Sequence, residues 1–118
     1  MIDEKLTILL ENDIIDDQIF KEMQDVIDYL KTSGVIINGD EVDVFITHLA
    51  MASARVKNQE DPIESVEDVV KSQIREAAEF EDAIKLWERV SEIVSIDFPI
   101  AENDYFYLHL VTLLQSKN

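Results

Sequence analysis

The sequence predicts an all-α protein, a compact bundle of about five helices joined by short loops. Two observations carry this prediction. The chain has only two glycines and two prolines in 118 residues, which leaves little material for hairpin turns or glycine-rich phosphate loops. Apolar side chains also recur at steps of three and four residues along most of the chain, as they do on one face of an amphipathic helix.

The first residues are the least informative part of the chain. Residues 1–14 are expected to form an N-terminal arm ahead of a single helical domain over residues 15–118. The apolar stretch Lys5–Leu10 is too short for periodicity to decide its structure, and the alternatives are a strand, a half-turn or an arm packed on a neighbouring molecule.

The first clear helix is predicted to begin at Asp16 or Asp17, either of which can cap it, and to end near Ser33 and Gly34. A short apolar connector over residues 35–39 follows. The apolar stripe of this helix consists of Ile19, Phe20, Met23, Val26, Ile27 and Leu30.

A second helix is expected after the connector, with Asp40 as its cap and Asp43 three places on. A polar break at residues 58–62 ends it. Its buried stripe consists of Val42, Phe45, Ile46, Leu49, Ser53 and Val56.

The second half of the chain predicts three more helices. One runs from about Glu64 to a break near residues 76–80, where the apolar phase shifts. The next begins at about Glu81 and is stopped by Asp97–Pro99. The last covers about residues 102–114.

Charge is the outlying feature of the composition. The chain has 26 acidic and 10 basic residues and a net charge of −16, and residues 1–60 and 61–118 each hold 13 acidic and 5 basic residues. An evenly acidic surface repels phosphate backbones and anionic lipid, so we expect neither nucleic acid nor a membrane as a partner. No cysteine is present, which excludes disulfides and thiolate sites. With no export signal at the N-terminus, a cytoplasmic protein is expected.

The two histidines are the side chains most able to do chemistry. His48 lies roughly 100° from the centre of its helix's buried stripe, and Arg55, seven residues later, falls within about 20° of the same line. Val44 and Met51 lie near that line. This seam looks like a contact surface with a polar centre.

His109 lies on a helix that is apolar almost all round, so this helix is either central to the bundle or covered by another chain. Glu102 precedes His109 by seven residues and falls on nearly the same line. A single histidine on an apolar helix is typically a hydrogen-bonded packing residue. The chain has no HxxxH or HExxH spacing, no strained Gly-x-Ser-x-Gly turn and no distinct acid/base pair, so we predict no metal site, no cofactor and no catalytic residue.

Two segments together resemble a known family. Thr47–Arg55 holds a histidine followed seven residues later by arginine, and Phe98–Leu110 holds a proline turn, an acid and an aromatic helix ending in histidine. About sixty residues separate the histidines. In this order and spacing, residues 15–116 resemble the phosphotransferase-system regulation domain (PRD) of bacterial antiterminators and transcriptional activators.

The resemblance implies a stand-alone, non-enzymatic regulatory module. It would sense phosphorylation of His48 and His109 by a phosphocarrier protein of the sugar phosphotransferase system, with Arg55 and Glu102 as supporting residues. A homodimer formed through the two histidine-bearing helices is expected to carry the signal, or else a protein partner, which the net charge of −16 suggests is basic.

Two other functions stay open at this point. The family pattern often has acids at the positions of Thr47 and Ala101, and these departures favour an acidic interaction adaptor that keeps the fold without phosphorylation. A third reading is an enzyme or metal protein that uses the two histidines with nearby carboxylates.

Overall fold

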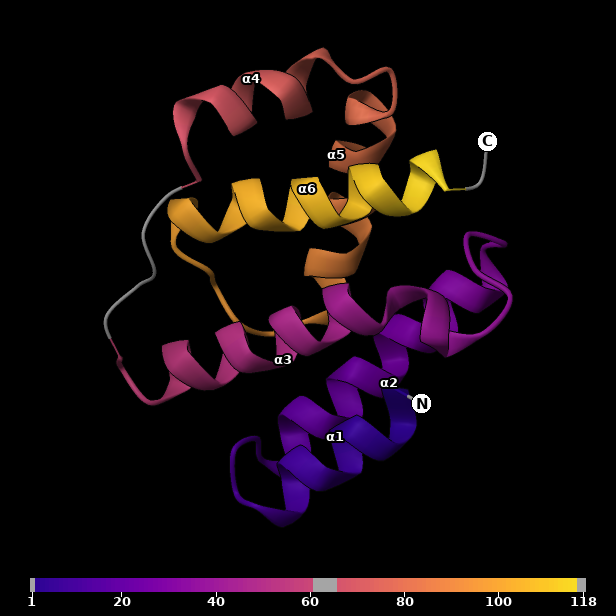
Figure 1. The fold of residues 1–118 in the computed structure, drawn as a ribbon. Helices are drawn as coiled ribbons and strands as arrows, with labels where there is room; N and C mark the ends of the chain where they lie inside the picture. The colour runs from indigo at the N-terminus through magenta and orange to yellow at the C-terminus, as the bar shows by residue number, and fades with distance from the viewer. Residues whose placement is uncertain (1, 61–65, 117–118) are drawn as a thin grey trace.

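The computed structural model describes residues 2–60 and 66–116 and contains six α-helices and one short 3-10 helix over these residues (Figure 1). No strand occurs in them, so the predicted all-α class is confirmed, with one helix more than expected. The elements are α1 (Ile2–Glu11), α2 (Asp17–Thr32), η1 (Gly39–Val42), α3 (Asp43–Lys57), α4 (Asp68–Glu76), α5 (Phe80–Ile93) and α6 (Ile100–Gln115).

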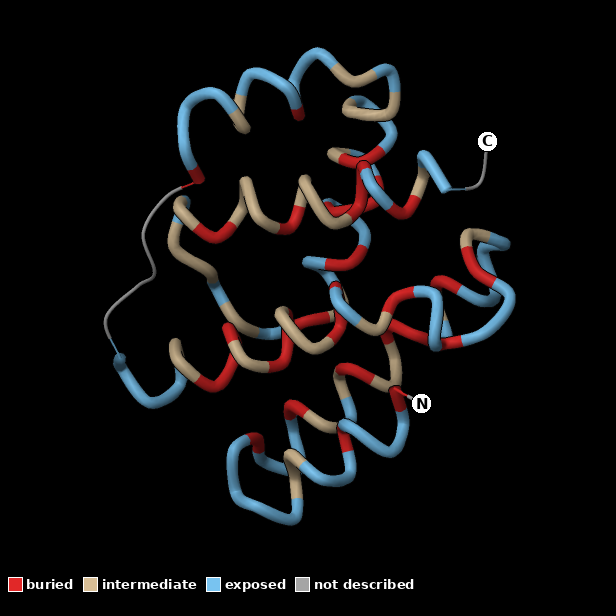
Figure 2. Tube along the Cα trace, viewed as in Figure 1, coloured by how far each residue is buried: buried red, intermediate tan, exposed pale blue. Residues whose placement is uncertain are grey.

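Helices α3 and α6 run side by side through the middle of the molecule (Figure 1). Helices α1 and α2 pack against α3, while α4 and α5 pack against α6. Buried residues face inward along each of these helices, and the outer surfaces are exposed (Figure 2). None of the described helices is both long and apolar enough to span a bilayer.

The N-terminal segment differs from the expected arm. It forms α1, and its Ile2 and Leu6 are fully buried against α2 and α3 of the same chain. The backbone N–H of Ile2 donates a hydrogen bond to Oδ1 of Asp40 at 3.0 Å, and Lys5 forms an ion pair with Asp43 at 2.7 Å. Two polar contacts thus attach this helix to η1 and to the first residue of α3.

Helix α2 begins and ends as predicted. The Asp16 carboxylate accepts a hydrogen bond from the backbone N–H of Ile19 at 2.8 Å, which is the geometry of an N-cap. Ser33 is the C-cap, and Gly34 follows with φ at +83°, a left-handed conformation that glycine adopts without strain.

The predicted cap at Asp40 is wrong. Asn38 caps η1, and Glu41 completes a capping box with it, so the chain enters α3 through a 3-10 turn rather than directly. Helix α3 itself begins at Asp43 without a side-chain cap. The carboxylate of Asp40 instead accepts the hydrogen bond from the backbone N–H of Ile2 in α1.

The predicted break near residues 76–80 is confirmed, since α4 ends at Glu76 and α5 begins at Phe80. Helix α4 begins at Asp68, four residues after the predicted start at Glu64, which lies outside the described residues, as does Pro62 of the predicted polar break. Helix α6 begins directly after Pro99.

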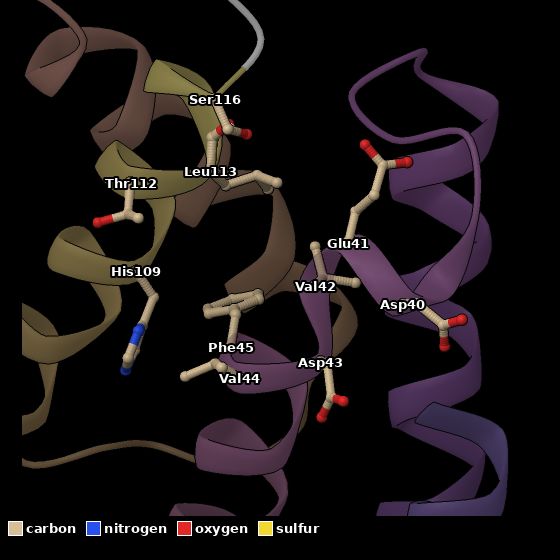
Figure 3. A pocket seen from close by; sticks show the side chains of 10 residues that line it. All are labelled: Asp40, Glu41, Val42, Asp43, Val44, Phe45, His109, Thr112, Leu113 and Ser116. Atoms are coloured by element: carbon tan, nitrogen blue, oxygen red, sulfur yellow. The ribbon is translucent and has the colours of Figure 1, made fainter. Parts of the chain in front are cut away.

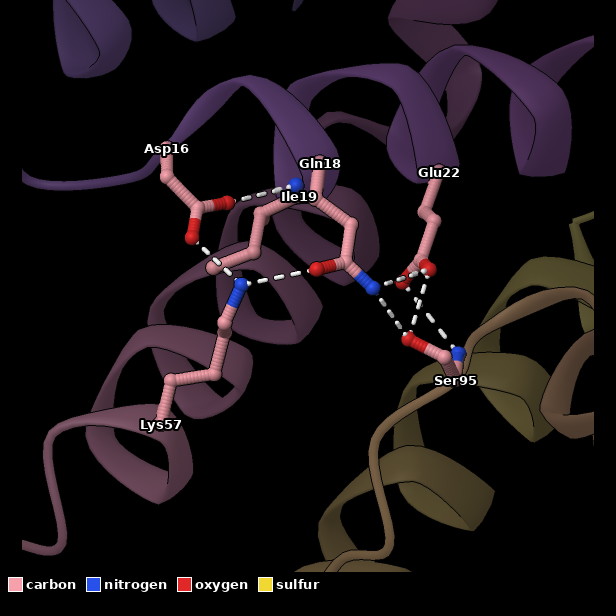
Figure 4. A network of polar contacts seen from close by, with 6 residues as sticks. All are labelled: Asp16, Gln18, Ile19, Glu22, Lys57 and Ser95. Carbon is pink, nitrogen blue, oxygen red and sulfur yellow. Dashed lines mark hydrogen bonds and ion pairs between the residues drawn. The ribbon is translucent and has the colours of Figure 1, made fainter.

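A polar network ties three distant segments together on one side of the fold (Figure 4). Lys57, at the end of α3, contacts the carboxylate of Asp16 and the side-chain oxygen of Gln18 at the start of α2. Gln18 and Glu22 both bond Ser95, which lies between α5 and α6. The network therefore anchors the C-terminal end of α3 relative to α2 and to the approach to α6.

The interior between α3, α5 and α6 is aromatic. Phe106 of α6 is 0% exposed and stacks on Trp87 with ring centroids 4.4 Å apart. The ring centroids of Phe98 and Phe45 lie 5.0 and 6.2 Å from the ring centroid of Phe106. Offset and edge-on ring pairs of this kind are each worth about 0.5–1.5 kcal/mol beyond the area they bury. This cluster fixes the spacing of α3 and α6, the two helices that carry both histidines.

Candidate functional site

All four site residues predicted from the sequence meet where α3 packs against α6. His48 and Arg55 lie two turns apart on α3, and Glu102 and His109 lie two turns apart on α6. Residues seven apart share one line on a helix, so each pair forms a row along its helix. The packing of α3 against α6 places these two rows opposite each other.

Glu102 is the centre of the arrangement. Its side chain is only 2% exposed, and Arg55 donates a hydrogen bond from Nη2 to Glu102 Oε2 at 2.9 Å. The other carboxylate oxygen, Oε1, lies 3.5 Å from Nε2 of His48. One buried carboxylate of α6 thus faces both a guanidinium and an imidazole of α3, and the position of Glu102 in the first turn of α6 suits its negative charge.

The two imidazoles lie against each other and against the aromatic interior. The ring centroids of His48 and His109 are 5.3 Å apart, with their planes inclined at 61°. Phe106 meets His48 edge-on at 5.3 Å, and Tyr105 covers it at 5.5 Å with the rings tilted by 31°. Within the described part of the chain, Glu102 is the charged group within ion-pair distance of His48, and Arg55 is the cation paired with Glu102.

Burial shifts the pKa of both histidines downward, which favours the neutral imidazole at pH 7. Burial lowers the pKa of His48 below its ordinary value of about 6.5; Glu102 opposes this effect and the positive charge of Arg55 adds to it. Burial also lowers the pKa of His109, and the neighbouring His48 lowers it further. A neutral imidazole carries a free nitrogen lone pair, so each ring can act as a nucleophile near neutral pH.

Each histidine opens onto the surface through its own hollow. His48 lines a pocket of about 400 Å³ together with Lys5, Thr47, Met51 and Arg55. The pocket at His109 has a volume of about 310 Å³ (Figure 3). Its other lining residues are Asp40, Glu41, Val42, Asp43, Val44, Phe45, Thr112, Leu113 and Ser116.

Asp43 and Val44, in the first turn of α3, line both pockets and so lie between the two openings. The predicted seam of His48, Arg55, Val44 and Met51 thus forms the wall of one opening. Within residues 2–60 and 66–116, no three His, Asp or Glu side chains are grouped so that they could hold a metal ion.

The sequence prediction missed the contributions of Tyr105, Lys5 and Asp43. Tyr105 lies three residues after Glu102 and four before His109, which is the spacing of one helix face and is a signal that could have identified it. Lys5 could not be placed in this way, because it reaches the His48 pocket from α1, a helix the sequence did not predict.

Comparison with known proteins supports the same family. The chain matches the PRD domain family over residues 26–113 of its 118 residues, a span that includes all four site residues. No curated protein and no solved structure matches the chain. The matched span begins within α2, so α1 lies outside it. The chain belongs to the PRD domain family, a family of regulatory rather than catalytic domains connected with the phosphotransferase system.

Proposed function

We propose that this PRD domain accepts phosphoryl groups on His48 and His109 from a phosphocarrier protein of the sugar phosphotransferase system, and that it signals through dimerisation or a protein partner. The observation that carries the proposal is the meeting of two imidazoles, 5.3 Å apart, each at the edge of its own surface pocket. A purely structural histidine needs no such opening.

Charge gives the modification its effect. A phosphoryl group adds about −1.5 to −2 charges if it behaves like the phosphoesters. On His48 that charge would appear in a pocket whose cations are Arg55 and Lys5, each already paired with a carboxylate. The group would compete for these cations and so change the contacts of α3 with α6 and with α1.

The surroundings of His109 indicate the kind of donor. The acidic residues of its pocket are Asp40, Glu41 and Asp43, and no lysine or arginine of residues 2–60 and 66–116 lines it. A donor with a basic surface around its phosphohistidine is complementary to these acidic residues, and opposite charges speed and orient such encounters. The net charge of −16 acts in the same direction.

The surface between the two openings suits an association that phosphorylation can control. Val44 is 66% exposed there, although it lies beside both pockets. An exposed apolar side chain flanked by two modifiable groups favours contact with a second copy or another protein when the histidines are neutral. A phosphoryl group on either histidine would add charge at the edge of this contact.

The test combines mass spectrometry with single-histidine variants. The chain is incubated with a phosphorylated phosphocarrier protein, and its intact mass is measured at alkaline pH, where phosphohistidine survives. We expect up to two added phosphoryl groups on the wild-type chain, one on each of the single variants His48→Ala and His109→Ala, and none on the double variant. Light scattering on the same samples reports the oligomeric state. An unmodified wild-type mass would refute the proposal.

One observation favours a second function, an acidic interaction adaptor. Thr47, which replaces the acid often found before the first histidine of the family pattern, donates its hydroxyl to Asp43 at 3.3 Å. In this second function the acidic residues of the His109 pocket, Asp40, Glu41 and Asp43, would bind a basic segment of a partner directly. A partner recovered equally by the wild-type chain and by the double histidine variant would select this function over phosphorylation.

A further inference from the structure

We infer that Glu102 is a positioning residue that holds His48 in the tautomer protonated at Nε2, so that Nδ1 is the nitrogen that takes the phosphoryl group. The second half of this inference rests on the proposed function. The first half concerns the unmodified protein and can be tested without any donor.

The inference begins from two buried polar atoms that face each other. Nε2 of His48 and Oε1 of Glu102 are both buried and lie 3.5 Å apart, and neither has a hydrogen-bond partner within the described residues. Buried polar atoms of a native protein are almost always paired. If both atoms offered only lone pairs they would repel each other, so one of them must carry a proton.

The proton belongs on the imidazole. Arg55 has only donors, and it already donates to the second oxygen of Glu102, so the carboxylate acts as an acceptor on that side. An ionised carboxylate has no proton to offer His48, whereas a neutral imidazole always has one N–H. With that N–H at Nε2, a shift of a few tenths of an ångström converts the contact into a charge-assisted hydrogen bond.

This assignment leaves Nδ1 with the free lone pair. The His48 side chain is 20% exposed although its Nε2 is buried, so the exposed part of the ring lies away from Glu102. His109, Tyr105 and Phe106 contact the ring, but none is negatively charged. Among residues 2–60 and 66–116, Glu102 is thus the one charged group within ion-pair distance of His48, and it favours a proton on Nε2. In other proteins the hydrogen bond made by one ring nitrogen likewise sets the role of the other.

The transfer balances without an extra acid or base. The Nδ1 lone pair of His48 forms the new N–P bond, the N–P bond of the donor phosphohistidine breaks, and its electron pair returns to the donor ring. Nε2 keeps its proton, so the phosphorylated His48 ring carries a positive charge that faces Oε1 of Glu102. The carboxylate stabilises that charge as it develops. Reversal of the same steps returns the phosphoryl group.

The tautomer is measured by NMR on protein labelled with ¹⁵N-histidine at a pH of about 8, where imidazoles are neutral. His109→Ala leaves His48 as the single histidine and gives an unambiguous assignment. We expect a protonated Nε2, an unprotonated Nδ1 and a nuclear Overhauser contact between the Nε2 proton and the Glu102 side chain. A proton on Nδ1, or the absence of that contact, would overturn the inference even if no variant of Glu102 folds.

Glu102→Gln predicts a reversal rather than a loss. Arg55 would take the amide oxygen, because it can only donate, and the NH₂ group would then face Nε2 and drive the proton to Nδ1. Asp104→Asn is the matched control: Asp104 is the acid two residues further along α6, where it faces Lys71 and Arg75 rather than a histidine. A tautomer unchanged by Glu102→Gln in a folded variant, or reversed by Asp104→Asn, contradicts the assignment.

Phosphorylation of the His109→Ala variant then tests the acceptor nitrogen. We expect the Nδ1 phosphoryl isomer, and a rate roughly 10–100-fold lower when Glu102→Gln is added, the size of effect seen when a carboxylate that orients a metal-binding histidine is removed. The Nε2 isomer would overturn the inference and leave the proposed function intact. If no phosphoryl group is transferred to any form of the chain, the proposed function and the Nδ1 acceptor fail together, while the tautomer is still decided by the unmodified protein.

Discussion

The ion pair between Arg55 and Glu102 predicts a stability effect that can be measured without a phosphate donor. The variant Arg55→Met keeps most of the side-chain length and removes the charge. Among the described residues, the Glu102 carboxylate, which is 2% exposed, then keeps His48 as its one ion-pair partner. Breaking a fully buried pair costs about 3–5 kcal/mol, and losing one hydrogen bond to a charged group costs about 1.5–3 kcal/mol. Because a quarter of the Arg55 side chain is exposed, we expect a loss of about 2–3 kcal/mol.

The same variant has a predicted pH dependence, and its sign follows from His48. Burial, with Arg55 as a smaller contribution, holds the pKa of His48 below its unfolded value, so the unfolded chain binds more protons as the pH falls through about 6.5. The contribution of His48 to the free energy of unfolding therefore falls in that direction. Removing Arg55 raises the pKa of His48 and lets its protonated form pair with Glu102. The cost of Arg55→Met should be smaller at a pH of about 5.5 than at about 8.

Thermal and urea unfolding, followed by circular dichroism at both pH values, measure these quantities. At roughly 4 °C per kcal/mol for a domain of this size, Arg55→Met should lower the Tm by about 8–12 °C at the higher pH. Arg89→Met is the matched control, because Arg89 and Glu92 form an exposed pair at 3.9 Å whose loss should cost under about 0.5 kcal/mol. Equal costs for the two variants, or a cost of Arg55→Met that grows toward acid pH, would refute the reasoning.

Three further outcomes follow from the packing. Phe106→Ala should cost about 3–5 kcal/mol in urea unfolding, because the fully buried ring joins α3, α5 and α6; a value near 1 kcal/mol would contradict its central place. Gly39→Ala should cost about 1–3 kcal/mol, since its Cβ would lie 2.7 Å from Ile2 Cγ2, and Ile2→Ala in the same chain should cost less than in the wild type. Asp16→Ala should cost about 1 kcal/mol at pH 7 and Asp16→Asn less, because asparagine also caps. The hydrogen bond from Lys57, followed by the cap bond from Ile19, holds the pKa of Asp16 below 3.8. Asp16 therefore adds to the free energy of unfolding above a pH of 3.8, and this contribution is lost as the pH falls through the lowered pKa.

Spacing along single helices was the most predictable part of the protein. His48 and Arg55 form one row and Glu102 and His109 another because seven residues make nearly two full turns. Asp16 and Gly34 were predictable as the ends of α2 for a similar reason, since caps depend on a few adjacent residues. Local geometry of this kind can be derived from the sequence alone.

Contacts between helices could not be derived in this way. Nothing in the spacing of either row shows that Glu102 lies between Arg55 and His48, because that depends on how α3 and α6 pack over the aromatic interior. The error at Asp40 has the same origin. A residue that suits an N-cap by local rules instead accepts a hydrogen bond from Ile2, 38 residues away, while Asn38 and Glu41 cap a shorter turn.

The buried ion pair also sets how strongly phosphorylation of His48 would act on the fold. If Arg55 turned to the phosphoryl group, Glu102 would lose the same partner that Arg55→Met removes. Phosphorylation of His48 would then weaken the packing of α3 on α6 by up to about 2–3 kcal/mol, which is roughly 30–150-fold in a conformational equilibrium. Lys5 can turn to the phosphoryl group at a smaller cost in free energy, because its ion pair with Asp43 is exposed and lies on the wall of the same pocket. In that case α1 rather than α6 would report the modification. Lys5→Met distinguishes the two routes: it should leave the unmodified chain within about 1 kcal/mol of the wild type and direct the whole response to Arg55, so that phosphorylation destabilises this variant more than the wild type.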